Sequence, residues 1–320
     1  MIAKVVGLTA TLGSGMPLGK EGPFVHIASI VATLLTKLVT SFQGIYANES
    51  RNSEMLAAAC AVGVACCFGS PIGGVLFSIE VTSVYFAVRN YWRGFFAAII
   101  GAIVFRLLSI WFEDEETIVA VFRTGFSMEF PYDPQELIVF TLIGVCCGLG
   151  GALYVYMHRR YVLWMRGNKQ LTKFLQKNRF IYPFLISGLI SAVTFPPAPG
   201  MFQAADVTTH EQIETLFSNF TWARDVQEMR VDEYDHIKHW KDPYTQSIFV
   251  NLTIYIISTF FLSILAQTLP VPTGALIPSF KMGAAFGRLV GEAMHVWFPE
   301  GVRYIHLFFN PDIIVIFSYR

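Results

Sequence analysis

Long apolar stretches, repeatedly broken by glycine and proline, are the feature that most constrains how this chain can fold. Several of them approach the roughly 20 apolar residues that span a bilayer. They are Ile2–Leu12, Phe24–Phe42, Met55–Cys67, Ile72–Val88, Phe95–Phe112, Leu137–Met157, Ile181–Phe195, Ile248–Leu269 and Ala275–Phe298. Broken helices persist at membrane depth only where they are buried in protein or line a cavity. The pattern therefore predicts an all-α, polytopic membrane protein with broken helices, of the transporter or channel type.

The composition supports a membrane protein and excludes other classes. Hydrophobic residues make up 54% of the chain and charged residues only 14%, whereas soluble domains carry charge on about a quarter of their residues. The formal net charge is zero, and no tract is rich in lysine and arginine, so nucleic acid is not an expected partner. No catalytic triad, Cys/His metal set or Walker-type loop is present. We therefore predict no enzyme activity, no metal and no cofactor.

The five cysteines all lie inside apolar stretches. They have neither zinc-finger spacing nor the dispersed pattern of a disulfide scaffold. We predict buried free thiols. The residues are Cys60, Cys66, Cys67, Cys146 and Cys147.

Glu21 is an ionisable carboxylate in an unusual place, between two glycines and shortly before Pro23 and a long apolar helix. Proline suits the first turn of a helix, where its missing N–H costs nothing. The free N–H groups of that turn, with the helix dipole behind them, can hold an anion. The Glu21 side chain could occupy or vacate the same position, which predicts a gated anion site. The alternative is a carboxylate that only caps its own helix.

A second break echoes the first, because Gly274 precedes Pro278 by the same spacing that separates Gly19 from Pro23. Matching broken segments in two halves point to a binding site at the interface of an inverted repeat. Two helix starts that converge on one point would focus positive potential on an anion. Lys20 would add to this potential, or it would extend toward water as a snorkelling side chain.

Four longer motifs identify a family. They are Gly13–His26, Gly73–Ser83, Phe86–Phe96 and Gly283–Glu292. Together they resemble the CLC chloride channels and transporters, most closely the voltage-gated branch of the animal plasma membrane. The resemblance extends from Ile2 to about Gly301. It implies a homodimer in which each subunit contains its own pore and two inverted halves.

The resemblance also assigns roles to residues. It implies that Glu21 is the gating glutamate, which competes with chloride at an outer anion site. The backbone amides of Glu21, Gly22, Ala275 and Leu276 would line that site. Exchangers of the family carry a proton-relay glutamate where this chain has Val81. Because valine cannot carry a proton, the resemblance favours a passive channel.

The chain also departs from the family pattern. The resemblance implies a first filter motif before residue 1, and a pore tyrosine, further helices and paired CBS domains beyond Arg320. Residues 1–302 would then be a partial membrane domain, with a first half to about 133 and a second half at about 134–302. Residues 303–320 do not follow the family, and we interpret them as a divergent tail, with non-native sequence as one reading. Lys281 replaces an apolar family residue, as a snorkelling side chain or as a charge in the pore.

These observations predict voltage-gated, passive chloride conduction by a multi-pass protein of the plasma membrane, with chloride, the lipid bilayer and a second subunit as partners. One alternative is a proton–chloride antiporter of the same fold. Another is a truncated, non-conducting isoform that modulates full-length subunits. The sequon at Asn219, in the polar segment Thr208–Thr245, predicts glycosylation if that segment is extracellular.

Overall fold

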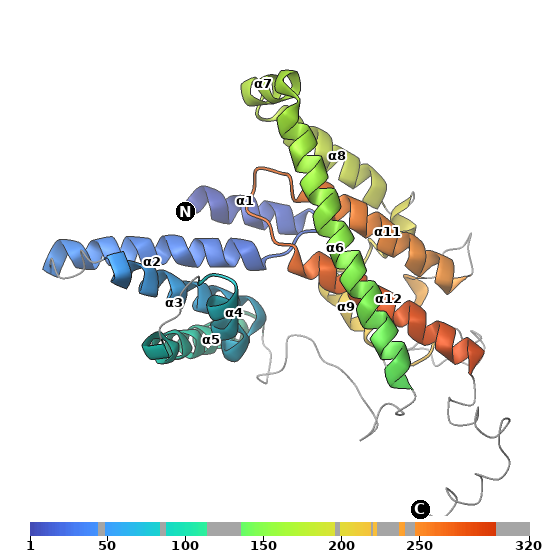
Figure 1. Ribbon diagram of the computed structural model, residues 1–320, viewed down its shortest axis with the longest axis horizontal. Helices are drawn as coiled ribbons and strands as arrows, with labels where there is room; N and C mark the ends of the chain where they lie inside the picture. Colours follow the sequence, from blue (N-terminus) through green and yellow to red (C-terminus); the bar gives the residue numbers. More distant parts are fainter. Residues whose placement is uncertain are drawn as a thin grey trace, which may run out of the picture. The chain divides into compact units, whose positions relative to one another are not determined.

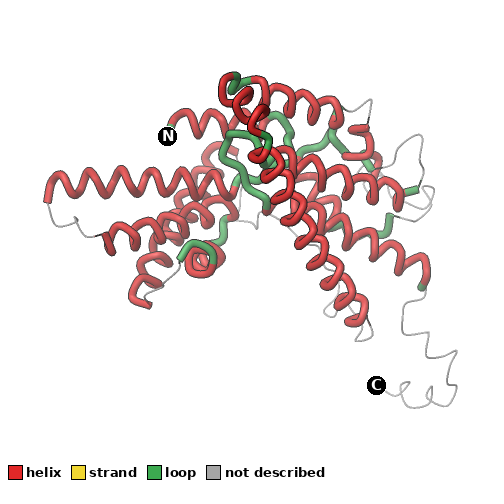
Figure 2. Tube along the Cα trace, turned by 45° about the horizontal axis from the view of Figure 1, so that its top comes forward, coloured by secondary structure: helices red, strands yellow, loops and turns green. Residues whose placement is uncertain are grey.

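The computed structural model describes residues 1–43, 49–83, 88–113, 136–195, 199–218, 220–222, 237–240 and 247–298. Throughout these ranges the regular structure is helical and contains no named strand (Figures 1 and 2). The helices are α1 (Ile2–Gly13), α2 (Glu21–Gln43), α3 (Glu49–Phe68), α4 (Pro71–Glu80), α5 (Tyr91–Glu113), α6 (Leu137–Gly167), α7 (Lys169–Lys177), α8 (Ile181–Thr194), α9 (Thr209–Leu216), α11 (Ile248–Ala266) and α12 (Leu276–Trp297), with short 3₁₀ turns η1 (Val88–Asn90) and η3 (Pro199–Gln203). The prediction of an all-α chain is confirmed.

Local sequence explains where several helices begin. Ser70 caps α4 by accepting a hydrogen bond from the N–H of Gly73, and Pro71 occupies the first turn, where a proline is favoured. Thr208 and Glu211 form a reciprocal capping box at the start of α9. The predicted stretch Ile72–Val88 is longer than the helix it contains, because α4 ends at Glu80.

Among the residues that the structure describes, four helices are long and apolar enough to cross a membrane, namely those containing Glu21–Val39, Tyr91–Leu108, Leu137–Gly167 and Ile248–Ala266. Shorter apolar helices accompany them, including α1, α4 and α8. This mixture of full and partial spans agrees with the predicted polytopic membrane fold.

The chain forms two compact units, and the first comprises Met1–Arg123 together with Leu269–Ile277. Within it, α3 packs against α2, α4 and α5. Small side chains at the helix contacts, among them Ala61 and Ala65, are completely buried. A methyl group added to Gly74 would collide with the carbonyl oxygen of Ala61. Close helix packing through small residues is typical of membrane proteins.

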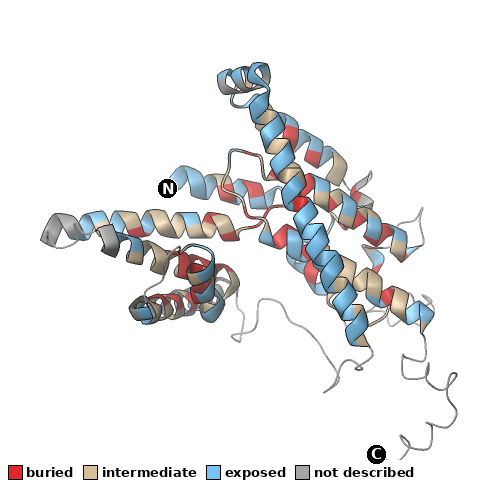
Figure 3. Cartoon of the chain, in the orientation of Figure 1, coloured by how far each residue is buried: buried red, intermediate tan, exposed pale blue. Residues whose placement is uncertain are grey.

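The second unit comprises Thr124–Thr268 and Pro278–Arg320. Its core gathers around Trp222, Trp240 and Tyr255, with Leu252 and Ala285 beside them. Helix α11 contacts α6, α8 and η3, and its 19 residues include many buried side chains. Helix α6 differs sharply, because Tyr154 is the one buried residue of its described side chains (Figure 3).

The cysteine prediction is only partly right. All five are free thiols, and Cys60 and Cys67 are buried. Cys66 is half-buried, whereas Cys146 and Cys147 on α6 are exposed, so the expected burial was wrong for these two. The reason is the solvent: an apolar stretch need not pack on protein when lipid can cover it.

The predicted division of the chain near residue 133 lies outside the described residues, as does the tail 303–320, and both stay predictions. The two compact units are not two continuous halves of the sequence, because the short segment Leu269–Ile277 belongs with the N-terminal unit. This segment brings the second glycine–proline break next to the first.

Candidate functional site

The two glycine–proline breaks meet in the first unit through a backbone pair. The N–H of Gly19 donates to the carbonyl of Gly274 at 2.9 Å, and the N–H of Gly274 donates to the carbonyl of Gly19 at 3.1 Å. This short antiparallel bridge places the start of α2 beside the start of α12. The first turns of the two helices, whose leading N–H groups have no partner within their own helix, therefore lie close together, as the spacing of the breaks suggested.

The Glu21 carboxylate lies between these helix starts and is 9% exposed. Its Oε1 accepts a hydrogen bond from the N–H of Leu276 at 2.5 Å. Its Oε2 is buried and has no hydrogen-bond partner within the described ranges. The carboxylate thus accepts from the first turn of another helix, which begins 255 positions away.

Three glycines leave the space in which this carboxylate lies. A methyl group built on Gly19 or Gly274 would overlap the carboxylate of Glu21. A methyl group built on Gly22 would lie 2.6 Å from the carbonyl oxygen of Thr273. All three φ angles lie outside the left-handed region, so these positions need glycine for its small size rather than for its backbone freedom.

The structure brings together most of the predicted site residues. Gly22 is the second residue of α2, and Ala275 directly precedes α12. Lys20, directly before α2, is half-buried. Val81 lies in the same unit, just after α4, with its side chain 65% exposed. Asn219 lies outside the described residues.

Sequence reasoning missed two contributors to this arrangement. The backbone bridge between Gly19 and Gly274 was hinted at by the repeated spacing, but one sequence alone carries no sign that the two breaks touch. The contact of Thr273 with Gly22 had no sequence signal at all.

The second unit contains two cations on α12, of which Lys281 is buried and Arg288 is largely buried. Lys281 is 8% exposed, and its Nζ lies 5.9 Å from the centroid of the Tyr255 ring. This burial contradicts the snorkelling interpretation. Arg288 forms an ion pair with Glu292 at 3.4 Å, and its guanidinium lies 4.7 Å over the ring of Trp222.

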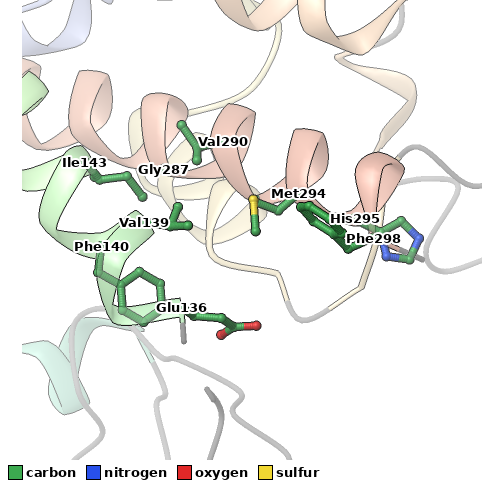
Figure 4. Close-up of a pocket in the computed structure, with 10 residues that line it drawn as sticks. Glu136, Val139, Phe140, Ile143, Gly287, Val290, Met294, His295 and Phe298 are labelled. Carbon is green, nitrogen blue, oxygen red and sulfur yellow. The ribbon is translucent and has the colours of Figure 1, made fainter. Parts of the chain in front are cut away.

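A cleft of about 370 Å³ lies in the second unit, between the start of α6 and the later turns of α12 (Figure 4). Its lining is mainly apolar, with Glu136 and His295 at one end. The lining residues are Glu136, Val139, Phe140, Ile143, Gly287, Val290, Gly291, Met294, His295 and Phe298. None of the predicted site residues belongs to this cleft, so the cleft is not part of the candidate anion site.

Comparison with known proteins identifies the family. The profile of the family "Voltage gated chloride channel" matches residues 1–311. The chain is 66% identical to a Drosophila melanogaster protein named Chloride channel protein 2 over 304 residues, which cover 95% of this chain and 25% of the relative. It is 56% identical to the human Chloride channel protein 2 over 302 residues, or 94% of this chain and 34% of the relative. It is 51% identical to the dog Chloride channel protein 1 over 303 residues, or 95% of this chain and 31% of the relative.

The chain thus spans between a quarter and about a third of the length of these curated relatives. Its apolar helices agree with membership of a channel family. The matched region includes both glycine–proline breaks and the Glu21 carboxylate between them. This chain belongs to the family of voltage-gated chloride channels.

Proposed function

We propose that this chain contributes a glutamate-gated part of a passive, voltage-gated chloride pore. Glu21 is the gate, and the backbone amides of Glu21, Gly22, Ala275 and Leu276 are the chloride ligands. The observation that carries the proposal is that only one oxygen of the Glu21 carboxylate is hydrogen-bonded. This oxygen accepts the Leu276 N–H at 2.5 Å, and the other has no partner in the described part of the chain. An anionic oxygen already fills the position that a chloride ion would take.

The physical chemistry of such a carboxylate favours movement. A single hydrogen bond contributes only about 0.5–1.5 kcal/mol net, or somewhat more when the acceptor is charged. A chloride ion that reaches the same amides can therefore displace the side chain, and protonation of Glu21 would remove its charge and its competition with chloride. Lys20, which directly precedes Glu21, adds positive potential that raises the local anion concentration.

The proton–chloride antiporter is the competing function on the same fold. An antiporter needs a titratable relay behind the gate, and Val81 offers none. A passive channel should show a chloride reversal potential that does not respond to a pH gradient. A reversal potential that moves with the pH gradient would favour the antiporter.

The gate is tested in the full-length channel that carries this segment. Glu21→Gln and Glu21→Ala should abolish voltage-dependent closure, because neither side chain carries the competing charge. Chloride currents should be recorded at several membrane potentials and chloride concentrations. Glu214→Gln is the matched control, since Glu214 is an exposed carboxylate on α9. Voltage-dependent closure that survives both Glu21 substitutions would contradict the gate.

We also propose, from the family resemblance, that the full-length subunits form a homodimer in the plasma membrane. Exposed apolar side chains on α4 and α5, such as Leu76 and Phe96, supply a surface that either lipid or a second subunit can cover. Cross-linking of surface-labelled protein should yield a species of twice the subunit mass. A species of subunit mass alone would contradict the dimer.

A further inference from the structure

Lys281 on α12 is a buried cation that the Glu21 gate does not use. Its side chain is 8% exposed, and its Nζ lies 5.9 Å from the centroid of the Tyr255 ring. Across the described ranges this ring is its recorded partner, and no carboxylate oxygen lies within 4.0 Å of Nζ. The charge of Lys281 is therefore not neutralised by the part of the chain that the structure describes.

The ring beneath Lys281 does not compensate for its burial. Removing an ammonium group from water costs several kcal/mol after relaxation. A cation–π contact returns about 2 kcal/mol when it is desolvated. A protonated Lys281 therefore needs an anion close to Nζ.

Arg288 on the same helix shows how this unit neutralises a buried cation with its own groups. Arg288 follows Lys281 by seven residues, which places both on one face of α12. Its guanidinium pairs with Glu292 at 3.4 Å and donates to the carbonyl of Ser218 at 2.7 Å. Lys281 has no equivalent carboxylate among the described residues, although it is at least as deeply buried as Arg288. The contrast points to a counter-ion that the described part of the chain does not supply.

The surroundings of Lys281 limit the size of that counter-ion. Tyr255 is 1% exposed, and its ring packs edge-on against Trp240 at a centroid distance of 5.1 Å. The ring is thus held in place beneath the ammonium group. An ion that reaches this buried ammonium group must be small and must lose most of its water, which suits a halide better than a phosphate or a carboxylate ligand.

We propose that the ammonium group of Lys281 binds a small monovalent anion of the halide class, as an anion position in the second unit in addition to the one at Glu21. The inference rests on the proposed function for the identity of the ion, because chloride is the halide that a chloride channel conducts. The site raises the occupancy of the pathway by chloride at low concentration.

The test is the dependence of conductance on chloride in the full-length channel, with gluconate keeping the ionic strength constant. Lys281→Met keeps the length of the side chain and removes the charge, and it should raise the half-saturating chloride concentration by at least about tenfold. Lys281→Arg keeps the charge and should stay within about threefold of the parent channel. Lys173→Met is the control, since Lys173 is exposed on α7. A half-saturating concentration that Lys281→Met leaves unchanged, at equal surface amounts, would overturn the proposal.

A second variant keeps the test decisive if Lys281→Met does not reach the cell surface. Lys281→Cys can be modified with 2-aminoethyl methanethiosulfonate, which restores an amine at this position. Restored chloride dependence with this reagent, and not with a neutral methanethiosulfonate of similar size, supports the site. Equal effects of the two reagents would refute it.

Current recordings of the Glu21→Gln variant under the same conditions separate this inference from the proposed gate. If Glu21→Gln abolishes voltage-dependent closure while Lys281→Met changes nothing, the gate stands and the second anion position fails. If Lys281→Met shifts the chloride dependence while Glu21→Gln gates normally, the anion position stands and the proposed gate fails.

Discussion

Glu21 and Glu292 are both buried carboxylates, in different compact units, yet they are held in opposite ways. Glu21 is 9% exposed and accepts one backbone hydrogen bond, from Leu276. Glu292 is 3% exposed, accepts the N–H of Trp222 at 3.0 Å and pairs with Arg288. Arg288 is itself tied to the carbonyls of Ser218 and Phe220.

The number and kind of hydrogen-bond partners determine which of the two carboxylates can move. A buried charge that is paired with an arginine and a backbone amide is costly to release, because either partner would be left uncompensated. A carboxylate on one hydrogen bond, with a second oxygen unused, loses little when another anion takes its place. The same residue type thus fixes the fold at Glu292 and is suited to gate at Glu21.

The largest expected effect is on the fixed carboxylate. Arg288→Met should destabilise the full-length protein by about 3–5 kcal/mol, because it leaves Glu292 buried without its cation. Thermal unfolding in detergent measures this loss. The double variant Arg288→Met/Glu292→Gln should recover part of it, since the unpaired charge is gone. A single variant within about 1 kcal/mol of the parent would show that the ion pair does not hold this unit together.

Two glycines beside the movable carboxylate should respond differently to the same added methyl group. Gly22→Ala brings the methyl group against the backbone carbonyl of Thr273, and such overpacking typically costs about 1–3 kcal/mol. Gly274→Ala meets the end of the Glu21 side chain instead, which can turn away. We expect Gly22→Ala to lower thermal stability more than Gly274→Ala does. Gly274→Ala should instead weaken voltage-dependent closure with little loss of stability. Equal stability losses in the two variants would contradict this view of the carboxylate.

Replacing the movable carboxylate itself should hardly affect folding. Glu21→Gln keeps an oxygen that can accept the Leu276 N–H, so the free energy of unfolding should change by no more than about 1 kcal/mol, while gating changes strongly. Thermal unfolding and current records on the same preparation measure both quantities. A loss of stability as large as that of Arg288→Met would show that Glu21 is a structural residue.

An exposed carboxylate should show the smallest effect. The backbone N–H and the hydroxyl of Thr208 hold the pKa of Glu211 below its usual range. Because the folded-state pKa is lowered, the added stability of α9 is present above the unfolded pKa of about 4.3 and is lost as the pH falls through the folded value. Thr208→Ala should destabilise α9 locally by about 1 kcal/mol. Part of that loss should persist at every pH, because the hydroxyl of Thr208 accepts the N–H of Glu211 whatever the charge of the carboxylate. Glu211→Gln removes the charge that accepts the Thr208 N–H, so hydrogen exchange across α9 should detect its effect at pH 7 and much less of it in strong acid. An effect of Glu211→Gln that is independent of pH would contradict the carboxylate's part.

Much of the fold could be predicted from the sequence because helix formation is local. The predicted stretch Leu137–Met157 begins where α6 begins, and Ile181–Phe195 differs from α8 by one residue at its end. The burial of side chains was less predictable. Cys146 and Cys147 lie in an apolar stretch and are nevertheless exposed, because hydrophobicity in a membrane protein does not tell packing from contact with lipid.

The candidate site was predictable in its parts and not in its contacts. The two glycine–proline breaks and the carboxylate at Glu21 are visible as spacing and residue type. The separation of 255 positions between Glu21 and Leu276 hides their hydrogen bond from any local pattern. The same holds for Lys281, whose charge is plain in the sequence and whose burial over Tyr255 is not.

The class of this protein, its helices and its family could be predicted from the residues alone, because the length of apolar stretches, the glycine–proline breaks and the motifs are local features of the sequence. The tertiary structure decided which charged groups are compensated. It paired Arg288 with Glu292, left one oxygen of Glu21 without a partner in the described ranges, and buried Lys281 beside an aromatic ring. The physical reason is that the cost of a buried charge depends on the groups that surround it in space, and long-range packing brings those groups together.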